Sequence, residues 1–526
     1  MTTDPVIYDL LGLGFGPANI AIAGAIVESW ANPSCHINKV LFIEKHHVFR
    51  WHPGMLLPGA KMQISFMKDL ATLRNPQSPI TFLSYLHSEG RLLKFINRGG
   101  TVPTRKEYAD YIGWAARYVE SQGVPVHWGT EIIGLDDGKE GTILVHAKSL
   151  ATGEVTVHRT RNLIIAPGGA PNIPRTFETI YKDPLFVHSS EYATSIDTIF
   201  QTIGASARPV RIAVVGSGQS AAEVTLNLNE RLSKIPVVGG RHRIEMIIRK
   251  GSLKPSDDSP FANEIFDPDS TDAWFSMPSA ILRSAQLKEY KGTNYGVVNP
   301  KTIDVLYELM YDQQVDERIS SRPGEQQLSD PFVILRPYTL TLAATQSQDA
   351  STVNPYVLTY QHAISGAITT EEYDAVICAT GYKRTAWIDL LKSCQIGKHF
   401  GLDPTTDASQ IRLAPETELH RGPSQMNYIQ SPADVSGASS PMSSSASNTP
   451  PTSPSLSHIS LPSPTLYISR NYRVLPNRAA TGEVAFKPKI YVQGVEEATH
   501  GLSDTLLSVM GIRAGEVVAD LMQEDA

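Results

Sequence analysis

The feature that most constrains the fold is a pair of glycine-rich turns, each placed between an apolar run and a helix-like segment. The first turn follows residues 6–11 and reads Gly12-Leu-Gly14-Phe-Gly16-Pro17-Ala-Asn19. The second follows residues 211–215 and reads Gly216-Ser217-Gly218-Gln219-Ser220. A buried strand that ends in such a turn lets the backbone approach a pyrophosphate at the N-terminus of the next helix. One such turn is weak evidence, but two in one chain predict that it holds two dinucleotides.

The residues at the end of the next apolar run distinguish the two turns. After the first turn, residues 40–43 lead into Glu44. An acid there can accept a hydrogen bond from a ribose hydroxyl, which favours FAD. After the second turn, residues 244–248 lead into Arg249 and Lys250. A cation there can clamp a 2′-phosphate, which favours NADP over NAD.

Composition is typical of an enzyme without a membrane span. The chain has 526 residues, enough for two or three domains, and no apolar run reaches the length of a membrane helix, about 20 residues. Its N-terminal residues lack a signal-peptide pattern, which predicts a cytoplasmic location. A net charge of −7 without a basic run argues against nucleic acid as a partner. The dispersed histidines have no zinc-ligand spacing, so no metal is predicted.

Two short apolar runs that end in small residues, 162–169 and 373–382, frame the second turn. They predict that the second dinucleotide-binding unit is inserted into the first. Residues 424–464 are rich in Ser, Pro, Thr and Ala, and we expect a disordered surface insertion there. The predicted fold is α/β, with two Rossmann-like dinucleotide-binding domains, for FAD and NADPH, and a small helical substrate region. The predicted parts are 1–205 (FAD domain, first part), 206–373 (NADPH domain, with a helical substrate-binding segment at about 255–325) and 374–526 (FAD domain, second part).

Further motifs give the chain a family resemblance. The turn at residues 14–19 has Asn19 in place of a third glycine, and the other motifs are residues 61–76, 256–264, 379–382 and 500–508. Together they resemble the fungal L-ornithine N5-monooxygenases of hydroxamate siderophore biosynthesis, from about residue 6 to 520 apart from the insertion. Of the wider flavin monooxygenase fingerprint only His188 and Tyr192 survive. That departure argues against a Baeyer-Villiger or drug-oxidising relative.

The resemblance implies a reaction and its partners. NADPH would reduce FAD, O2 would add to the flavin as a hydroperoxide, and the side-chain amine of L-ornithine would take the distal oxygen to give N5-hydroxyornithine. The protein would shield the peroxide from water and present a neutral amine in line. Relatives also imply a homotetramer.

The resemblance assigns the substrate contacts. Lys68 and Asn263 would hold the carboxylate and α-amino group of ornithine with help from Ser508, and Asn294 would contact the nicotinamide side and the substrate amine. Without the resemblance, Lys68 would be an ordinary solvated helix lysine and Asn294 a loop asparagine that caps a turn. The remaining predicted substrate-binding residues are Glu264, Ile265 and Phe266.

The cofactor contacts are likewise carried over motif by motif. The segment 505–507 would approach the flavin pyrimidine ring, where a helix dipole favours the anionic reduced flavin. The residues implied around FAD are Gly12, Gly14, Gly16, Pro17, Asn19, Glu44, Trp51, His52, Met62, Gln63, Thr505, Leu506 and Leu507. The residues implied around NADP are Ser217, Gly218, Gln219, Ser220, Arg249, Asn294, Tyr295 and Gly296.

Paired dinucleotide-binding turns also occur in three alternative kinds of protein. A pyridine nucleotide-disulfide reductase needs a redox dithiol that Cys35, Cys378 and Cys394 do not supply by spacing. An L-lysine N6-hydroxylase stays open, because one methylene is worth only about 1 to 3 kcal/mol of discrimination. A non-catalytic, NADPH-sensing flavoprotein also stays open, although the presence of Lys68 and the two asparagines speaks against it.

Overall fold

The first sheet is built around the first glycine turn in the computed structural model, which describes residues 6–325, 328–347, 355–419, 464–477 and 486–523. Its strands run in the order β3-β2-β1-β6-β5-β4, and β20 also pairs with β6. The pairs β1–β2, β2–β3, β1–β6 and β6–β20 are parallel, whereas β4 and β5 form an antiparallel edge. The strands are β1 (Ile7–Leu13), β2 (Val40–Ile43), β3 (Val126–His127), β4 (Thr130–Asp137), β5 (Ile143–Ser149), β6 (Val155–Ile165) and β20 (Lys489–Val492).

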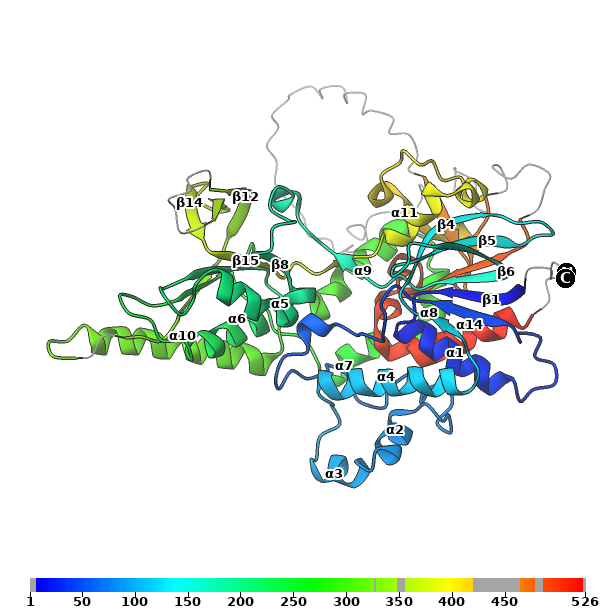
Figure 1. The fold of residues 1–526 in the computed structure, drawn as a ribbon, viewed down its shortest axis with the longest axis horizontal. Coiled ribbons are helices and arrows are strands. Elements are labelled where there is room, and N and C mark those ends of the chain that lie inside the picture. The colour runs from blue at the N-terminus through cyan, green and yellow to red at the C-terminus, as the bar shows by residue number, and fades with distance from the viewer. Residues whose placement is uncertain (1–5, 326–327, 348–354, 420–463, 478–485, 524–526) are drawn as a thin grey trace, which may run out of the picture.

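Both faces of this sheet are covered, which explains why β1 and β2 are nearly continuous apolar runs. Leu10 packs into the core on the face covered by helices, and Leu11 and Leu13 pack into the core on the opposite face. Helices α1, α4 and α14 gather on the first face (Figure 1), and α11 supplies side chains to the second core. The helices of this domain are α1 (Pro17–Ser29), α2 (Phe82–Ser88), α3 (Leu92–Asn97), α4 (Arg105–Ser121), α11 (Ala386–Ser393), α13 (Glu497–His500) and α14 (Met510–Leu521).

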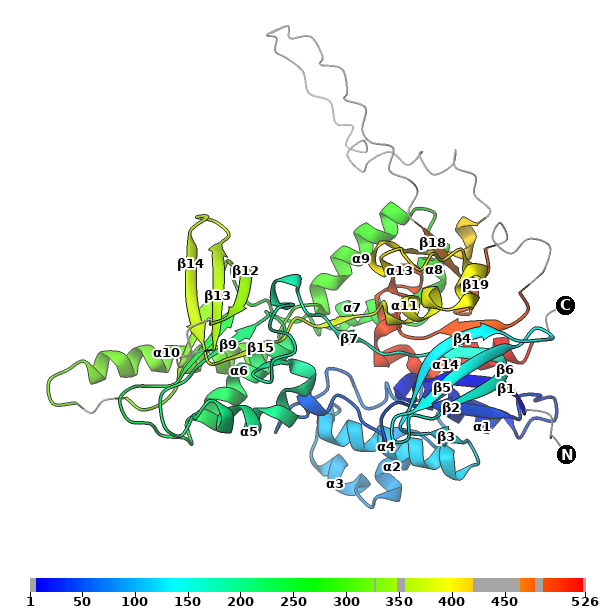
Figure 2. The ribbon, with the colours of Figure 1, turned by 45° about the horizontal axis from the view of Figure 1, so that its top comes forward.

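The second sheet is built around the second glycine turn and lies beside the first domain (Figures 1 and 2). Its strand order is β11-β10-β9-β15-β8, and all four pairings are parallel. A three-stranded antiparallel sheet of β12, β13 and β14 adjoins it. The strands are β8 (Phe186–His188), β9 (Arg211–Val215), β10 (Arg243–Ile247), β11 (Phe332–Arg336), β12 (Thr339–Gln346), β13 (Tyr356–His362), β14 (Ile368–Tyr373) and β15 (Ala375–Cys378). The helices α5 (Tyr192–Thr202), α6 (Gln219–Leu232) and α10 (Pro300–Ser320) belong to this domain.

The chain leaves the first sheet after β6 and returns to it with β20, so the second domain is inserted into the first, as predicted. At the crossing, β7 (Ala170–Pro171) pairs with β16 (Tyr382–Lys383) in an antiparallel ladder. Strands β8 and β15 belong to the second sheet, although the predicted boundaries place both in the FAD domain. We therefore propose boundaries at the β7–β16 pair, near residues 170 and 383, in place of 205 and 374.

The predicted substrate segment at 255–325 divides between the two domains. Helices α7 (Pro260–Asn263), α8 (Ser270–Ser276) and α9 (Ala280–Asn294) include neighbours of α13 in the first domain, whereas α10 packs on α6 and β11 of the second. The predicted insertion at 424–464 falls almost entirely on residues 420–463, which lie outside the described residues. On either side of it, β17 (Arg412–Pro415) pairs in parallel with β18 (Thr465–Ile468), which also pairs with β19 (Val474–Leu475).

No helix in the described parts of the chain is both long enough and apolar enough to cross a membrane. Within the same residues, no three His, Cys, Asp or Glu side chains come together as metal ligands. Cys35, Cys378 and Cys394 are free thiols.

Candidate functional site

The first glycine turn uses its glycines in three different ways. A Cβ at Gly12 would lie 2.3 Å from the Phe42 ring, so this glycine lets β1 pack against β2. Gly14 has a φ of +81°, a conformation that L side chains rarely adopt. A Cβ at Gly16 would meet no atom within 4 Å, so the turn faces open space at the start of α1. That open face is where a dinucleotide pyrophosphate fits.

Asn19 and Glu44 hold this turn in place. The buried Asn19 side chain donates to the carbonyl oxygens of Leu13 and Gly14, over 3.1 and 2.6 Å. Glu44 accepts from the backbone N–H of Phe15 over 2.8 Å. Each carboxylate oxygen has more than one acceptor site, so Glu44 can still accept from a ribose hydroxyl. Asn19 thus shapes the turn from inside, while Glu44 lies at its rim.

Both glycine turns lead into helices that lack a side-chain cap. Gly16 precedes α1 and Gly218 precedes α6, and neither residue can cap the first N–H groups of its helix. By contrast, Thr104 caps α4 and Ser279 caps α9. The N-termini of α1 and α6 therefore offer N–H groups and a positive dipole end to an external anion. Two pyrophosphates fit these two helix N-termini.

The second glycine turn is packed against two other parts of its domain. Gly216 has a φ of +145°, and a Cβ there would lie 2.3 Å from the carbonyl oxygen of Ala379. A Cβ at Gly218 would lie 3.4 Å from the Cα atom of Gly296. The predicted NADP residues 217–220 and 294–296 are therefore neighbours in space. The close approach at Gly216 leaves no room for a side chain, whereas a Cβ at Gly218 would make an ordinary van der Waals contact.

Positive charge gathers beside this turn. Arg249 is exposed two residues beyond β10, and Lys250 donates from Nζ to the carbonyl of Gly296 over 3.0 Å. Burial, together with the charges of Lys254 and Arg249, lowers the pKa of Lys250. Such an excess of positive charge suits a phosphate group. Lys250 was not among the predicted binding residues, although its position next to Arg249 was the available signal.

The Gln219 side chain is fully engaged within the protein. Its Oε1 accepts from the backbone N–H of Asn299 over 2.7 Å, and its Nε2 donates to Glu223 over 2.8 Å and to Thr302 over 3.2 Å. These contacts join the start of α6 to the start of α10. Only the backbone N–H of Gln219 is left to meet a phosphate.

Two histidines and a tyrosine lie at the junction of the domains. The Tyr382 ring centre lies 5.7 Å from that of His52 and 5.3 Å from that of His188. His188 donates from Nε2 to the Gly381 carbonyl, because a carbonyl only accepts, and burial lowers the pKa of His188 to about 4. Desolvation by the surrounding protein, together with the charge of Arg105, also lowers the pKa of His52. The lowered pKa leaves His52 neutral near pH 7.

Three predicted FAD neighbours border one hydrophobic core. Trp51, Met62 and Leu507 are half-buried and pack against the core that also contains the apolar faces of α1, α4 and α14. Gln63 is exposed beside them, and Leu506 is half-buried. An apolar wall of this kind excludes water from a reactive centre.

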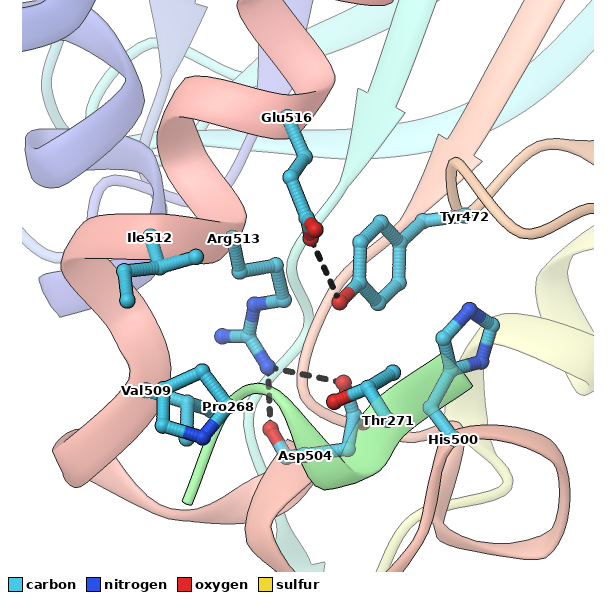
Figure 3. Close-up of a pocket in the computed structure, with 9 residues that line it drawn as sticks. All are labelled: Pro268, Thr271, Tyr472, His500, Asp504, Val509, Ile512, Arg513 and Glu516. Atoms are coloured by element: carbon cyan, nitrogen blue, oxygen red, sulfur yellow. Dashed lines mark hydrogen bonds and ion pairs between the residues drawn. The ribbon is translucent and has the colours of Figure 1, made fainter. Parts of the chain in front are cut away.

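Asp504, the residue before the predicted flavin segment 505–507, is held by a buried charge, Arg513 (Figure 3). Arg513 of α14 donates to the backbone carbonyl of Asp504 and, over 3.1 Å, to its carboxylate. Burial and the nearby Asp504 raise the pKa of Glu496 well above its usual value. Burial alone would also raise the pKa of Asp504, but Arg513 holds it below its usual value. Tyr472 stacks on His500 with ring centres 4.3 Å apart and closes this cluster.

Tyr295 joins the NADP-side turn to the flavin-side segment. Its hydroxyl lies 3.1 Å from Oγ1 of Thr505, and burial raises its pKa. The neighbouring Asn294 ends α9, and its Oδ1 is buried without a partner among the described residues. A buried polar atom without a partner costs about 1 to 3 kcal/mol. Asn294 Oδ1 is therefore an acceptor that no described residue satisfies.

The other predicted substrate residues, Ser508, Lys68 and Asn263, lie on three different segments of the chain. Ser508 is buried and its Oγ has no partner within the described chain. A Cβ at Gly511 would lie 3.2 Å from the carbonyl oxygen of Leu70, so the segment that carries Lys68 adjoins α14. Lys68 is partly exposed, and its amine makes no ion pair with any residue described. Asn263 ends α7 and donates from Nδ2 to the carbonyl of Asp258 over 3.1 Å, so in this conformation its amide is turned onto its own loop.

A cleft of about 400 Å³ opens between the α7–α9 region and the C-terminal segment. Two predicted substrate residues, Glu264 and Ile265, line it together with Leu502, Trp274 and Tyr290. Phe266 lies in the same short turn and is half-buried. The cleft brings the predicted substrate segment next to the segment that carries Ser508.

A cross-domain ion pair is a part of the site that sequence reasoning missed. Arg105, the first residue of α4, pairs through both Nη atoms with Glu223 of α6, over 2.6 and 2.9 Å. The Thr104–Glu107 capping pattern signals the start of a helix there but carries no information about a partner 118 residues away.

Comparison with known proteins identifies the family of this chain. Residues 6–384 match the family of L-lysine 6-monooxygenase/L-ornithine 5-monooxygenase. The chain belongs to this family. It is 52% identical to an L-ornithine N(5)-monooxygenase of Coprinopsis cinerea, across 99% of this chain and 98% of the relative. The predicted family resemblance and enzyme class are therefore confirmed.

Solved structures agree with the fold. The reduced form of the ornithine hydroxylase of Pseudomonas aeruginosa is 31% identical with a TM-score of 0.73, over 98% of this chain and 99% of that one. An ornithine N-hydroxylase of Kutzneria sp. 744, solved with reduced FAD, NADP+ and L-ornithine, is 27% identical with a TM-score of 0.72, over the same shares. The predicted α/β fold with two dinucleotide-binding domains is confirmed.

Proposed function

We propose that this protein hydroxylates the side-chain amine of L-ornithine at N5, using FAD, NADPH and O2, as the first step of hydroxamate siderophore biosynthesis. The observation that carries the proposal is the 52% identity, over almost the whole of both chains, to an enzyme named L-ornithine N(5)-monooxygenase. A cytoplasmic location and a homotetrameric assembly belong to the same proposal, on the family resemblance alone.

The two helix N-termini fit the two cofactors. The open face of Gly16 and the N-terminus of α1 would hold the FAD pyrophosphate, and Glu44 would accept from its ribose. Gly218 and the N-terminus of α6 would hold the NADPH pyrophosphate, with Arg249 at the 2′-phosphate. Bound FAD, once reduced, supplies the activation of O2.

The chain's own part in the reaction is to orient the substrate and keep the site dry. Lys68 would pair with the ornithine carboxylate, since its amine is unpaired in the described chain. The unpartnered Oδ1 of Asn294 can accept a hydrogen bond from the substrate amine, and Ser508 Oγ can add a further contact. The apolar wall around Trp51 and Met62 limits access of water.

A parallel assay tests the proposal. The purified protein, supplied with FAD and NADPH, is given L-ornithine, L-lysine or no substrate, and hydroxylamine product, O2 consumption and peroxide are measured together. We expect product with ornithine and peroxide in its absence. Product with lysine in preference to ornithine would make the protein a lysine N6-hydroxylase. NADPH binding without product on either amine would favour the sensor alternative.

A further inference from the structure

One carboxylate collects donors from three separate parts of the chain. Glu497, in α13, accepts at Oε1 from the hydroxyl of Tyr295 and from Oγ1 of Thr505, the latter over 2.6 Å. Arg384 Nη1 lies 2.8 Å from the same oxygen, and Lys291 Nζ lies 2.9 Å from Oε2. Arg384 also donates to the Tyr295 hydroxyl over 3.1 Å. All of these groups meet at Glu497.

The environment of Glu497 keeps it ionised. Its side chain is only 13% exposed. Burial alone would raise its pKa, but hydrogen bonds from Thr505, Tyr295 and Lys291 and the charge of Arg384 leave that pKa below its usual value. Hydrogen bonds to a charged acceptor are shorter and stronger than neutral ones. The contacts therefore hold their donors more firmly than surface ion pairs do.

Each donor comes from a segment with a different place in the site. Tyr295 lies between Asn294 and Gly296, and Gly296 packs on the second glycine turn at Gly218. Thr505 begins the segment predicted to face the flavin. Arg384 directly follows β16, where the chain crosses between the domains. Glu497 thus contacts three segments at once: the turn at 294–296, the segment at 505–507 and Arg384, where the chain crosses between the domains.

We propose that Glu497 is a positioning residue that fixes the 294–296 turn relative to the 505–507 segment, and thereby the nicotinamide side of the site relative to the flavin side. This inference rests on the proposed function. Glu497 acts through Tyr295 and Thr505, without any contact of its own to the reacting atoms. Because transfer between two bound groups depends steeply on their separation and orientation, a small displacement of either segment lowers the efficiency of the reaction.

The main test is Glu497→Gln in the full-length holoenzyme. Glutamine keeps an acceptor for Thr505 and Tyr295 but removes the charge that holds Arg384 and Lys291. We expect unchanged FAD content, continued NADPH oxidation, at least a threefold fall in hydroxylated ornithine formed per NADPH, and a matching rise in peroxide. The KM for NADPH and the Kd for NADP+ should rise severalfold, while the KM for ornithine changes less than twofold.

Two further variants make the result decisive. Tyr295→Phe removes one hydroxyl with little change of shape. It should likewise lower the hydroxylated ornithine formed per NADPH and raise the Kd for NADP+. Glu230→Gln is the matched control and should leave all readouts unchanged, because Glu230, near the C-terminal end of α6, forms an exposed ion pair with Lys234 just beyond the helix.

The proposal is overturned if Glu497→Gln retains FAD and shows wild-type coupling and NADP+ affinity. Should Glu497→Gln fail to bind FAD, Tyr295→Phe decides, and wild-type values in that variant overturn the proposal. A wild-type enzyme that forms no product from ornithine would instead refute the proposed function. The NADP+ affinity of the variants still tests the positioning role in that case.

Discussion

At the scale of single residues, several predicted site residues carry polar groups that have no partner in the described chain. Arg249 is exposed beyond β10, and Lys68 lacks an ion pair in the part of the chain that is described. Asn294 Oδ1 and Ser508 Oγ are buried without partners. Arg249 was predicted from its place directly after a strand, whereas Lys68, Asn294 and Ser508 were implied by the family resemblance, and the roles of all four stay predictions. The partners of Glu497 could not be predicted in this way, because they come from distant segments.

Arg249→Ala should change the choice of coenzyme. Loss of a phosphate pair worth about 1.5 to 3 kcal/mol should raise the KM for NADPH by one to two orders of magnitude and leave the KM for NADH almost unchanged. Steady-state kinetics with both coenzymes measure this, with Arg318→Ala on the exposed face of α10 as the control. Equal effects on NADPH and NADH would show that Arg249 does not bind the 2′-phosphate.

Lys68→Ala should uncouple the reaction. Removing a charge-assisted contact in a partly dry site should weaken ornithine binding by about 2 to 4 kcal/mol, with both dinucleotide sites intact. FAD content and NADPH oxidation should stay normal while peroxide replaces the hydroxylated product. A hydroxylamine assay beside O2 consumption checks this, with Lys94→Ala, at an exposed lysine of α3, as the control. A wild-type KM for ornithine and wild-type coupling in Lys68→Ala would show that Lys68 is an ordinary solvated lysine.

At the scale of elements, the segment between α13 and α14 is held from two sides. Glu496 and Asp504 face the buried Arg513, whereas Glu497 faces Arg384 and Thr505. The sequence indicated a helix start at this place, and the structure shows short turns at Leu502–Thr505 and Leu507–Val509 before α14 begins at Met510. Buried charges add to the few i→i+3 hydrogen bonds of these short turns. Periodicity alone does not reveal such an arrangement.

Arg513→Met should destabilise this segment. The substitution leaves the buried Asp504 carboxylate without its cation, and loss of one partner of a buried pair costs about 3 to 5 kcal/mol. We expect a Tm lower by roughly 5 °C or more and release of FAD on dilution. Thermal unfolding and flavin fluorescence measure both, with Arg318→Met as the control. A Tm equal to the wild-type value would mean that Arg513 contributes little to the anchoring.

Deletion of residues 431–463 should leave the fold intact. Leu413 and Leu466 are register partners in the β17–β18 pair, and Arg412 N–H donates to the carbonyl of Pro464 over 2.9 Å, so the described chain is already paired where it resumes. The remaining residues 420–430 serve as a linker, and a longer or shorter loop changes closure entropy only slightly. Flavin content and Tm should match the wild type. Loss of FAD from the deletion variant would show that the segment is structural.

At the scale of the whole molecule, each glycine turn predicts its own sheet because strand, turn and helix are adjacent in sequence. The insertion of one domain into the other was also predicted from the apolar runs that frame the second turn. The boundaries were not, since β15 pairs with β9, and β8 pairs with β15, across long stretches of chain. Which sheet a short strand joins is decided by tertiary packing, and a run of three or four apolar residues fits either sheet.

Arg105 and Glu223 should set how firmly the two domains are joined. Their side chains are 15% and 12% exposed, and the pair is bidentate, so it is better shielded and more directional than a surface ion pair. Arg105→Met and Glu223→Gln should each lower the product formed per NADPH, because a looser junction lets the nicotinamide side move away from the flavin side. The double variant should be little worse than either single one, with an interaction free energy of about 0.5 to 3 kcal/mol in thermal unfolding. Strictly additive losses in the double-mutant cycle would mean that the two side chains act independently, and that other contacts across the junction hold the domains together.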